Sequence, residues 1–317
     1  MKEDARASGI AYREFVPPPV RPRPSMPAQT PNIVSCLSEA SSAYDAILCD
    51  VWGVLHDGRR AFAAASEALA RYRAAGGAVA LITNAPRPSP PVQSQMLRLG
   101  VSPDAFDAVV TSGDVTMALV EARAEAPLHH IGADRDLSLF DAIEARTGKR
   151  APRVGLAEAS YVLCTGLEHD DVETPADYAP RLAALAARGL PFICANPDLV
   201  IHRGEQLVYC AGALALDYEA LGGSVTYAGK PHAPIYEAAL GACAAALGRV
   251  PARVLAIGDG FRTDMFGARG QKLDTLFVAG GIHRDETMAA EEVDPAGLAR
   301  LFAKEGFAPT ATIAALR

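Results

Sequence analysis

The sequence predicts an α/β fold: a Rossmann-like core with a doubly wound, mostly parallel sheet, into which a smaller α/β domain is inserted. Three observations lead to this prediction. Short apolar runs alternate with helix-period patterns over residues 44–124, and the same alternation resumes over residues 227–285. Between these blocks, roughly residues 125–226 have strand and helix patterns of their own. The chain has 317 residues, 50% of them hydrophobic, which is enough to fill two cores.

The first block predicts three parallel strands. Apolar runs place them at residues 46–51, Ala78–Thr83 and Ala108–Thr111. The helix pattern between the first two strands ends at Gly76, because glycine permits the left-handed turn that closes a helix. A second helix is predicted to start at Ser89, with a proline in its first turn, and to end at Gly100. Strands that alternate with helices in this way are expected to be parallel, with helices on both faces of the sheet.

The insert and the C-terminal block show the same kinds of pattern. In the insert, strands are predicted near residues 129–131, 161–165 and 191–195. One helix of the insert starts at Thr174 and ends at Gly189. In the C-terminal block, strands are predicted at residues 253–258 and 274–278. We therefore assign residues 34–124 and 227–317 to the core domain and residues 125–226 to the inserted domain.

Residues 1–33 are predicted to form a flexible, proline-rich tail. Residues 16–31 contain seven prolines and few side chains that could pack in a core. No folded element is expected there, and a docking role for the tail is the alternative.

The composition excludes some classes of function. The net charge is -7 and no long basic run occurs, so nucleic acid is not expected as a partner. No apolar run is long enough to span a membrane, and the first residues lack an apolar core of signal-peptide length. The six cysteines form no C-x-x-C pair and mostly lie in apolar runs, which is typical of reduced thiols in a cytoplasmic protein. The oligomeric state is left open, with a homo-oligomer as one alternative.

Polar residues stand at or just beyond the C-terminal ends of candidate strands, the edge at which open α/β sheets bind ligands. Asp50 ends a buried apolar strand, where a carboxylate is costly unless it has a partner or a task. Such a carboxylate could attack phosphorus and form an aspartyl-phosphate. Thr83 and Asn84 end the next strand, and their side chains could hold phosphate oxygens at the start of the following helix.

Two further segments supply charge near the same edge. Lys230, just before a predicted helix, could neutralise both the nucleophile and a phosphate. Asp259 follows a strand and Asp264 lies five residues later, and hard carboxylate oxygens suit Mg²⁺. Alone, each signal is weak, since a strand-end Asp is often a helix cap and Gly-Lys-Pro is often a turn. Together and in this order, they predict a metal-dependent phosphate site.

These segments resemble the haloacid dehalogenase superfamily, and within it class IIA, the NagD-like and p-nitrophenyl-phosphatase-like group. The resemblance covers about residues 44–285 and rests on the stretches DVWGVLHDG, LITNAP, GKPHAPIYEAAL and IGDGFRTDMFGA. In the insert, YVLCTGLEHD and FICANPDL are similar to the α/β cap of that class. The resemblance implies Mg²⁺ as cofactor, hydrolysis of phosphate esters, and a cap inserted between the second and third motifs.

The resemblance also implies a role for each matching residue. Asp50 would be the nucleophile and a metal ligand. Thr83 and Lys230 would bind phosphate. Asp259 would be the second carboxylate on Mg²⁺, and Asp264 would support the metal shell.

Trp52 departs from the family pattern. The first motif of the family is D-x-D-G, and its second Asp is the general acid and base; in this sequence that position is Trp52. The family's metal contact there uses the backbone carbonyl, which tryptophan retains, but an indole does not exchange a proton near neutral pH. Leaving-group protonation and water activation are therefore in question, and such steps are worth about 10²–10⁴-fold in rate. Plain apolar packing of the indole is the alternative interpretation.

Other candidates have an ordinary interpretation beside the functional one. His56 and Asp57 could supply a replacement proton or belong to a solvated turn. Arg87 and Asn84 are included among the substrate-binding candidates, although a surface position is the commoner fate of a lone arginine. A loop after an insert strand could face the active site or form a polar turn, and it carries Asn196, Asp198, His202 and Arg203.

The predicted function is Mg²⁺-dependent hydrolysis of a small phosphorylated metabolite, such as a sugar phosphate or a nucleotide, through an aspartyl-phosphate. One alternative is a catalytically impaired relative that binds a phosphorylated ligand as a sensor. Another is a different reaction on the same nucleophile, such as phosphonate or carbon–halogen cleavage. The set of Asp50, Lys230 and Asp259 favours chemistry, whereas Trp52 argues against ordinary phosphatase chemistry. No pattern in the sequence identifies the substrate.

Overall fold

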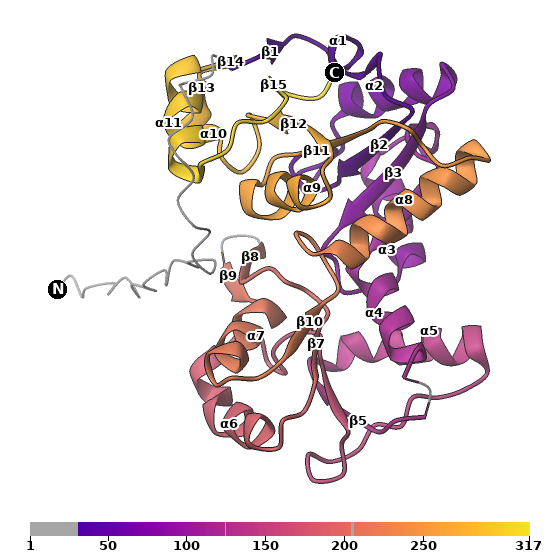
Figure 1. Ribbon diagram of the computed structural model, residues 1–317, viewed down its shortest axis with the longest axis vertical. Helices are drawn as coiled ribbons and strands as arrows, with labels where there is room; N and C mark the ends of the chain where they lie inside the picture. Colours follow the sequence, from indigo (N-terminus) through magenta and orange to yellow (C-terminus); the bar gives the residue numbers. More distant parts are fainter. Residues whose placement is uncertain (1–30, 124, 204–205) are drawn as a thin grey trace, which may run out of the picture.

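The computed structural model describes residues 31–123, 125–203 and 206–317. Figure 1 shows two α/β units stacked along the long axis, and the chain passes from the larger unit to the smaller one and back. The larger unit is built on a seven-stranded sheet and the smaller one on a four-stranded sheet. The predicted α/β fold with a mostly parallel central sheet is confirmed.

All neighbouring strands of the seven-stranded sheet are parallel, in the order β1-β15-β12-β11-β2-β3-β4. These strands are β1 (Ile33–Val34), β2 (Ala46–Asp50), β3 (Ala78–Thr83), β4 (Ala108–Thr111), β11 (Val254–Gly258), β12 (Asp274–Val278) and β15 (Ala311–Ile313). After β2 the chain adds β3 and β4 on one side, and later adds β11, β12 and β15 on the other. The order therefore reverses between β2 and β11. At such a switch point a doubly wound sheet opens a crevice along its C-terminal edge.

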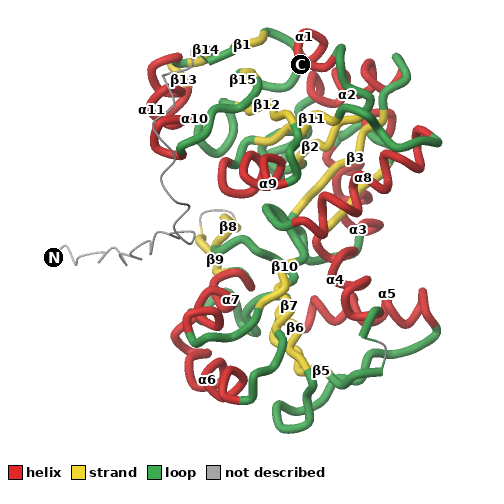
Figure 2. The backbone as a smooth tube through the Cα atoms, viewed as in Figure 1, coloured by secondary structure: helices red, strands yellow, loops and turns green. Residues whose placement is uncertain are grey.

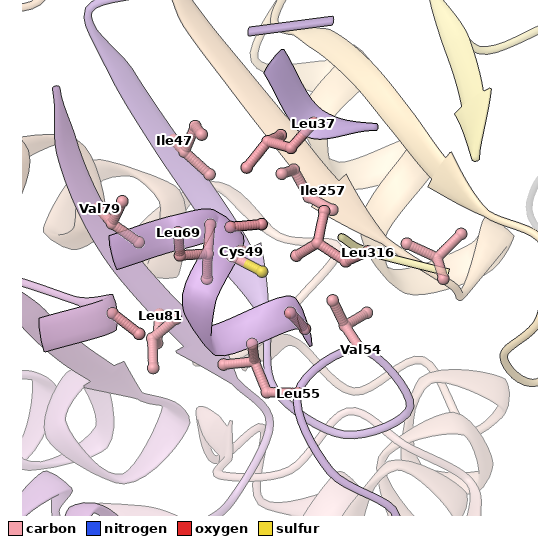
Figure 3. Packing of buried hydrophobic residues seen from close by; sticks show 14 of the residues in the cluster. Leu37, Ile47, Cys49, Val54, Leu55, Leu69, Val79, Leu81, Ile257 and Leu316 are labelled. Atoms are coloured by element: carbon pink, nitrogen blue, oxygen red, sulfur yellow. The ribbon is translucent and has the colours of Figure 1, made fainter. Parts of the chain in front are cut away.

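Helices cover both faces of this sheet, as Figure 2 shows. The main ones are α2 (Ala63–Ala74), α3 (Ser89–Leu99) and α8 (Ala233–Leu247). On one face, α2 packs against Ile47 and Leu81 in the apolar cluster of Figure 3. On the other face, Ile235 and Tyr236 of α8 pack against Leu48. Because both faces are buried, β2 and β3 are apolar along their whole length up to the terminal polar residue.

The remaining helices and strands of the larger unit are short or peripheral. They are α1 (Leu37–Ser41), η1 (Pro103–Ala105), α4 (Ser112–Glu121), the π-helical η4 (Phe261–Met265), α9 (Phe266–Gly270), α10 (Arg284–Thr287), β13 (Met288–Ala289), β14 (Glu292–Val293) and α11 (Pro295–Glu305). Helix α11 is amphipathic and buries Leu298 and Phe302 against Phe261. Helix α4 leads the chain out of this unit and α8 leads it back in.

The smaller unit, called the insert below, lies between α4 and α8 in the chain. Its four-stranded sheet is parallel throughout, in the order β10-β7-β6-β5. Its strands and helices are β5 (Leu128–Ile131), η2 (Asp134–Leu137), α5 (Ser138–Thr147), β6 (Tyr161–Cys164), η3 (Pro175–Tyr178), α6 (Ala179–Ala187), β7 (Phe192–Cys194), α7 (Ala211–Ala220) and β10 (Val225–Tyr227). A separate antiparallel hairpin joins β8 (Val200–Arg203) to β9 (Gln206–Tyr209). Two apolar clusters fill the insert, so it has a core of its own.

The predicted strands agree with the structure to within one residue at each end. The sequence does not predict several short strands, among them β1, β9 and β14, and a strand of two residues is too short to reveal a period. Ile33, placed in the tail by the sequence, instead forms β1 with Val34, since the two residues pair with Thr312 and Ile313. Residues 1–30 of the predicted tail lie outside the described residues.

The cysteines and the helices agree with the expectations from composition. None of the six cysteines forms a disulfide, and all but Cys36 are buried. Within the described ranges, no helix combines the length and apolar character needed to cross a membrane.

The packing of β3 gives a test of the assigned core. Leu81 is fully buried between the sheet and α2 (Figure 3), whereas Leu221, at the end of α7, is 50% exposed. Leu81→Ala leaves a cavity, so we expect the free energy of unfolding in urea to fall by about 2–5 kcal/mol. Leu221→Ala is the matched control, with an expected change below about 0.5 kcal/mol. Equal losses in the two variants would contradict this core.

Candidate active site

The C-terminal edge between β2 and β11 holds a cluster of buried charged side chains. Asp50 is the last residue of β2, and Asp259 directly follows β11. Lys230 lies between β10 and α8, and Asp264 lies in η4. None of the four is more than 7% exposed. The structure therefore brings together residues from both blocks of the core sequence, at the switch point of the sheet.

Lys230 binds two of the three carboxylates. Its Nζ donates to Asp50 Oδ1 at 2.6 Å and to Asp264 Oδ1 at 2.7 Å. One carboxylate oxygen from each of Asp50, Asp259 and Asp264 lies within 4.8 Å of the others. Asp50 Oδ1 also accepts the N–H of Val51 at 2.7 Å. Among the residues that the structure describes, Asp50 Oδ2 has no hydrogen-bond partner, so this oxygen is left open.

Burial and close charges set the protonation of the cluster. Burial and the charge of Asp264 raise the pKa of Asp50 well above its ordinary range, although Lys230 opposes the shift. Burial and Asp264 also raise the pKa of Asp259, to about 6. Burial alone would lower the pKa of Lys230, but the charges of Asp264 and Asp50 outweigh it and raise that pKa. The ammonium is therefore charged, whereas the raised pKa values of Asp50 and Asp259 show that it does not fully offset the repulsion among the carboxylates.

This donor set fits a hard divalent cation. Three carboxylates against one ammonium leave two negative charges when all are ionised, and buried charge is costly without a counter-ion. Mg²⁺ prefers oxygen ligands, keeps several waters and needs few carboxylates. Asp50 and Asp259 are the residues that would hold it. Asp264 is more engaged, because its two oxygens accept from Lys230 and from the N–H of Gly260, the latter at 3.1 Å.

Two glycines make room for Asp259. A Cβ added at Gly53 or at Gly281 would lie 2.1 Å from Asp259 Oδ2, so no side chain fits at either position. Gly53 also has φ +80°, a left-handed conformation that favours glycine. The same Asp259 oxygen accepts the N–H of Ile282 at 2.8 Å. The loops after β2 and β12 are thus packed directly onto this carboxylate and fix its orientation.

Asp264 is held by a π-helical turn and by α8. The turn η4 follows Gly260, and π-helical turns are frequent at functional sites. The hydroxyl of Tyr236, a fully buried residue of α8, donates to the carbonyls of Thr263 at 3.2 Å and of Asp264 at 3.3 Å. This contact positions the backbone from which the Asp264 side chain reaches Lys230.

The three candidates after β3 have different surroundings. Thr83 ends β3, and its Oγ1 accepts the N–H of Ala85 at 3.3 Å, which leaves the hydroxyl proton available. Asn84 is buried, and its Oδ1 accepts the N–H of Lys230 at 2.7 Å while its Nδ2 donates to the carbonyl of Lys230 at 3.1 Å. Asn84 therefore holds the backbone of Lys230 in place. The guanidinium of Arg87 is exposed and donates to Gln95 Oε1 at 2.8 Å on α3.

The insert reaches the core at Asn84. Asn84 Nδ2 donates to Asp198 Oδ1 at 2.9 Å, and burial raises the pKa of Asp198 while this bond lowers it. Asn196 is turned within its own loop, since its Oδ1 accepts the N–H of Asp198 at 3.1 Å. Nearby, the Ser112 hydroxyl donates to the carbonyl of Ala195. The sequence pattern of an Asn-Pro-Asp turn was present, but nothing in it indicated the partner across the junction. The side chains of residues 202 and 203 lie outside the described parts.

Trp52 and His56 form one aromatic pair in the segment that follows Asp50. Trp52 is 54% exposed, and its ring meets that of buried His56 edge to face, with centroids 5.3 Å apart. His56 Nδ1 accepts the N–H of Gly58 at 3.1 Å, and burial lowers the pKa of His56. A buried neutral imidazole is poorly suited to the acid role considered for it. Asp57 caps its own turn, because its Oδ1 accepts the N–H of Arg59 at 2.9 Å.

Two family models match the chain. The one described as haloacid dehalogenase-like hydrolase matches residues 47–146, and one described as HAD-hydrolase-like matches residues 227–304. The first match includes Asp50, and the second includes Lys230 and Asp259. No curated protein matches the chain.

Several solved structures have a similar fold. A hydrolase of the haloacid dehalogenase-like family from Brucella suis 1330 is 45% identical, with a TM-score of 0.75 over 90% of this chain and 100% of that chain. NagD from E. coli K-12 is 20% identical, with a TM-score of 0.61 over 86% of this chain and 96% of that chain. A p-nitrophenyl phosphatase from Archaeoglobus fulgidus is 16% identical, with a TM-score of 0.66 over the same shares. At 20% and 16% identity, the similarity to NagD and to the p-nitrophenyl phosphatase shows a shared fold.

The raised pKa of Asp259 makes cation binding depend on pH. In the metal-free protein this group favours the folded state at low pH, and its contribution is lost as the pH rises through about 6. Mg²⁺ competes with the proton for the carboxylate, so it should stabilise the protein more at about pH 8 than at about pH 5. We expect a larger Mg²⁺-induced rise in Tm at the higher pH, measured by thermal unfolding. Asp259→Asn should remove most of this difference, and equal shifts in the unaltered protein would contradict the assignment.

The junction at Asn84 is testable by a double-mutant cycle. Asn84→Ala leaves the Lys230 backbone and the Asp198 carboxylate without partners, so we expect a loss of about 1–3 kcal/mol in stability to urea. Asp198→Ala removes only the contact across the junction. The two variants combined should show a coupling of about 1 kcal/mol, and additivity within about 0.5 kcal/mol would mean that the contact is not energetically significant.

Proposed function

The chain belongs to the haloacid dehalogenase-like family of hydrolases, and from that membership we propose that it hydrolyses phosphate monoesters of small molecules with Asp50 as the nucleophile. The observation that carries this proposal is the setting of Asp50. It is a buried carboxylate at the switch point of the sheet, with one oxygen held by Lys230 and the other open among the described residues. The acidic cluster beside it supports Mg²⁺ as the cofactor.

The proposed reaction has two displacements at phosphorus. Asp50 Oδ2 attacks phosphorus, the P–O bond to the alcohol breaks, and the alcohol oxygen leaves with the bonding electrons. Water then attacks the aspartyl-phosphate, the bond to Asp50 breaks, and the proton released from water goes to solvent or to the departed alkoxide. The sum is one ester and one water converted to one alcohol and one inorganic phosphate. The chain itself is regenerated.

Lys230 has two tasks in this scheme. Its ammonium lowers the repulsion between the carboxylate of Asp50 and a phosphate dianion, and it donates in the transition state to the developing charge. Because Asn84 holds its backbone on both sides, the ammonium is already in place before substrate binds. The Thr83 hydroxyl at the end of β3 could donate to a phosphoryl oxygen. When bound, Mg²⁺ would neutralise charge on the carboxylates and on the phosphoryl oxygens.

Trp52 supports a preference for esters with good leaving groups. The indole cannot donate its proton to a leaving alkoxide. A phenolate needs little protonation as the bond to phosphorus breaks, whereas an alkoxide needs much more. The proposed substrates are therefore esters whose alcohol is acidic.

The insert and the cysteines support two further parts of the proposal. We assign the insert the role of a cap over the crevice, on the support of its position in the chain and of the Asp198–Asn84 contact beside Lys230. A closing cap excludes water from the site. The lack of disulfides among the six cysteines favours a reducing compartment such as the cytoplasm.

A binding role is the second candidate, and Trp52 is the observation that favours it. With no proton donor at that position, a relative of such hydrolases could hold a phosphorylated ligand and turn it over slowly or not at all. Asp50 and Lys230 would then serve in binding alone.

Activity on two classes of ester tests the proposal. With Mg²⁺, we expect hydrolysis of p-nitrophenyl phosphate with a kcat/KM about 10² times that for an alkyl phosphate such as glycerol phosphate, because the aryl ester needs no acid. Stopped-flow release of p-nitrophenolate should show a burst, since water attack on the aspartyl-phosphate also lacks a base. Trp52→Asp should raise kcat on the alkyl ester.

The nucleophile has its own variant and a matched control. Asp50→Asn should lower turnover by more than about 10³-fold, because the amide cannot attack phosphorus. Asp57→Asn makes the same chemical change on a nearby turn, and it should leave turnover unaltered. Fast hydrolysis of alkyl phosphates without a burst would contradict the role of Trp52. No turnover of either ester would favour the binding role.

A further inference from the structure

Trp52 is the only tryptophan of the chain, and it stands exposed beside the proposed nucleophile. It lies two residues after Asp50, and 54% of its surface is open to solvent. Single exposed apolar residues are common on proteins, so exposure alone carries no conclusion. What distinguishes Trp52 is that His56 and Gly58 both contact its ring.

Three features of the chain fix the indole. The six-membered ring lies over Gly58, where an added Cβ would be 2.3 Å from Cη2, so any larger residue would displace it. Gly58 has φ +83°, which also favours glycine. Buried His56 meets the indole edge to face at 79°, and a backbone bridge links the two residues. An edge-to-face neighbour supports an aromatic ring without covering both of its faces.

The loop that carries the indole is fixed to the catalytic carboxylates. The next residue, Gly53, packs against Asp259 with no room for a side chain. The N–H of Gly53 donates to the carbonyl of His56 at 2.9 Å, which closes the turn under Trp52. The ring therefore sits at a set position relative to the cluster of Asp50 and Asp259. An immobilised aromatic ring loses little conformational freedom when a ligand stacks on it.

We propose that the exposed indole is a stacking platform, and that the substrate is a phosphomonoester whose alcohol carries a planar aromatic or heteroaromatic group near the phosphate. The proposal rests on the proposed function for the phosphate half of the ligand. The charged cluster binds the phosphate, and Trp52 binds the ring. Stacking of a ring on an aromatic side chain does not depend on the identity of the ring, and it strengthens binding by about tenfold or more.

Leaving-group chemistry and stacking both favour aryl esters, so the test uses ligands that separate them. Benzylphosphonate and cyclohexylmethylphosphonate have the same phosphonate and similar size, and neither has an ester bond to hydrolyse. They differ in whether the ring is aromatic. Inorganic phosphate is the ligand without a ring. All three are titrated into the full chain with Mg²⁺ present, by calorimetry and by tryptophan fluorescence.

The expected result is a ratio of dissociation constants. Benzylphosphonate should bind about tenfold more tightly than cyclohexylmethylphosphonate, and it alone should strongly quench the fluorescence of the single tryptophan. In Trp52→Leu the ratio should fall to about one, and in Trp52→Phe most of it should be retained. Val250→Ala removes an apolar side chain that is 81% exposed beyond the N-terminal end of β11, and should leave the ratio at its original value.

Each other outcome contradicts the proposal in its own way. If both phosphonates bind equally, the platform is refuted while the phosphate site stands. If inorganic phosphate changes the fluorescence as much as benzylphosphonate does, the indole responds to movement of the insert and not to a stacked ring. If phosphate and both phosphonates fail to bind with Mg²⁺ present, the proposed function is refuted together with the platform.

Discussion

The ammonium of Lys230 is the constraint on which the active-site region depends. It is almost fully buried and binds both Asp50 and Asp264. Without it, two carboxylates would face each other in a buried space, and at least one would take up a proton. The side chain of Lys230 joins the end of β2 to the turn η4, and the start of the loop after β3 holds its backbone in the connection from β10 to α8. The arrangement of the charged cluster follows from keeping that ammonium in place.

A buried ion pair contributes little to stability by itself, because desolvation offsets the attraction. Its value here is geometric. Lys230 fixes Oδ1 of Asp50, and the backbone around Asp259 fixes the second carboxylate. The remaining negative charge destabilises the cluster when no cation is bound, and it favours the binding of a cation. The protein has a net charge of -7 and yet is expected to bind an anionic ligand. The local positive charge of Lys230 and of a bound cation would make such binding possible.

Most of the fold and the centre of the site could be predicted from the sequence. Parallel strands end at one edge, so Asp50 and Asp259 at two strand ends were expected to meet, and they lie in one cluster. Contacts between the two units could not be predicted in this way. Asn84 looked like a phosphate ligand, yet its amide is occupied by the backbone of Lys230 and by Asp198. A side chain with several possible partners takes the one that the tertiary structure presents, and a local pattern does not contain that information. The direction of the Trp52 ring depends on Gly58 for the same reason.

The close packing at Gly229 has a consequence for how such a protein can evolve. A Cβ there would lie 2.4 Å from Oδ1 of Asn84 and 2.7 Å from Cδ of Pro197, so both units touch the residue that precedes the lysine. The smaller unit is therefore not an interchangeable module, because a foreign replacement would have to reproduce this joint or displace Lys230. New specificities are more easily acquired by varying surface elements that lie away from the joint. In proteins that share this architecture, the residues around Gly229 would therefore vary less than surface residues away from the joint.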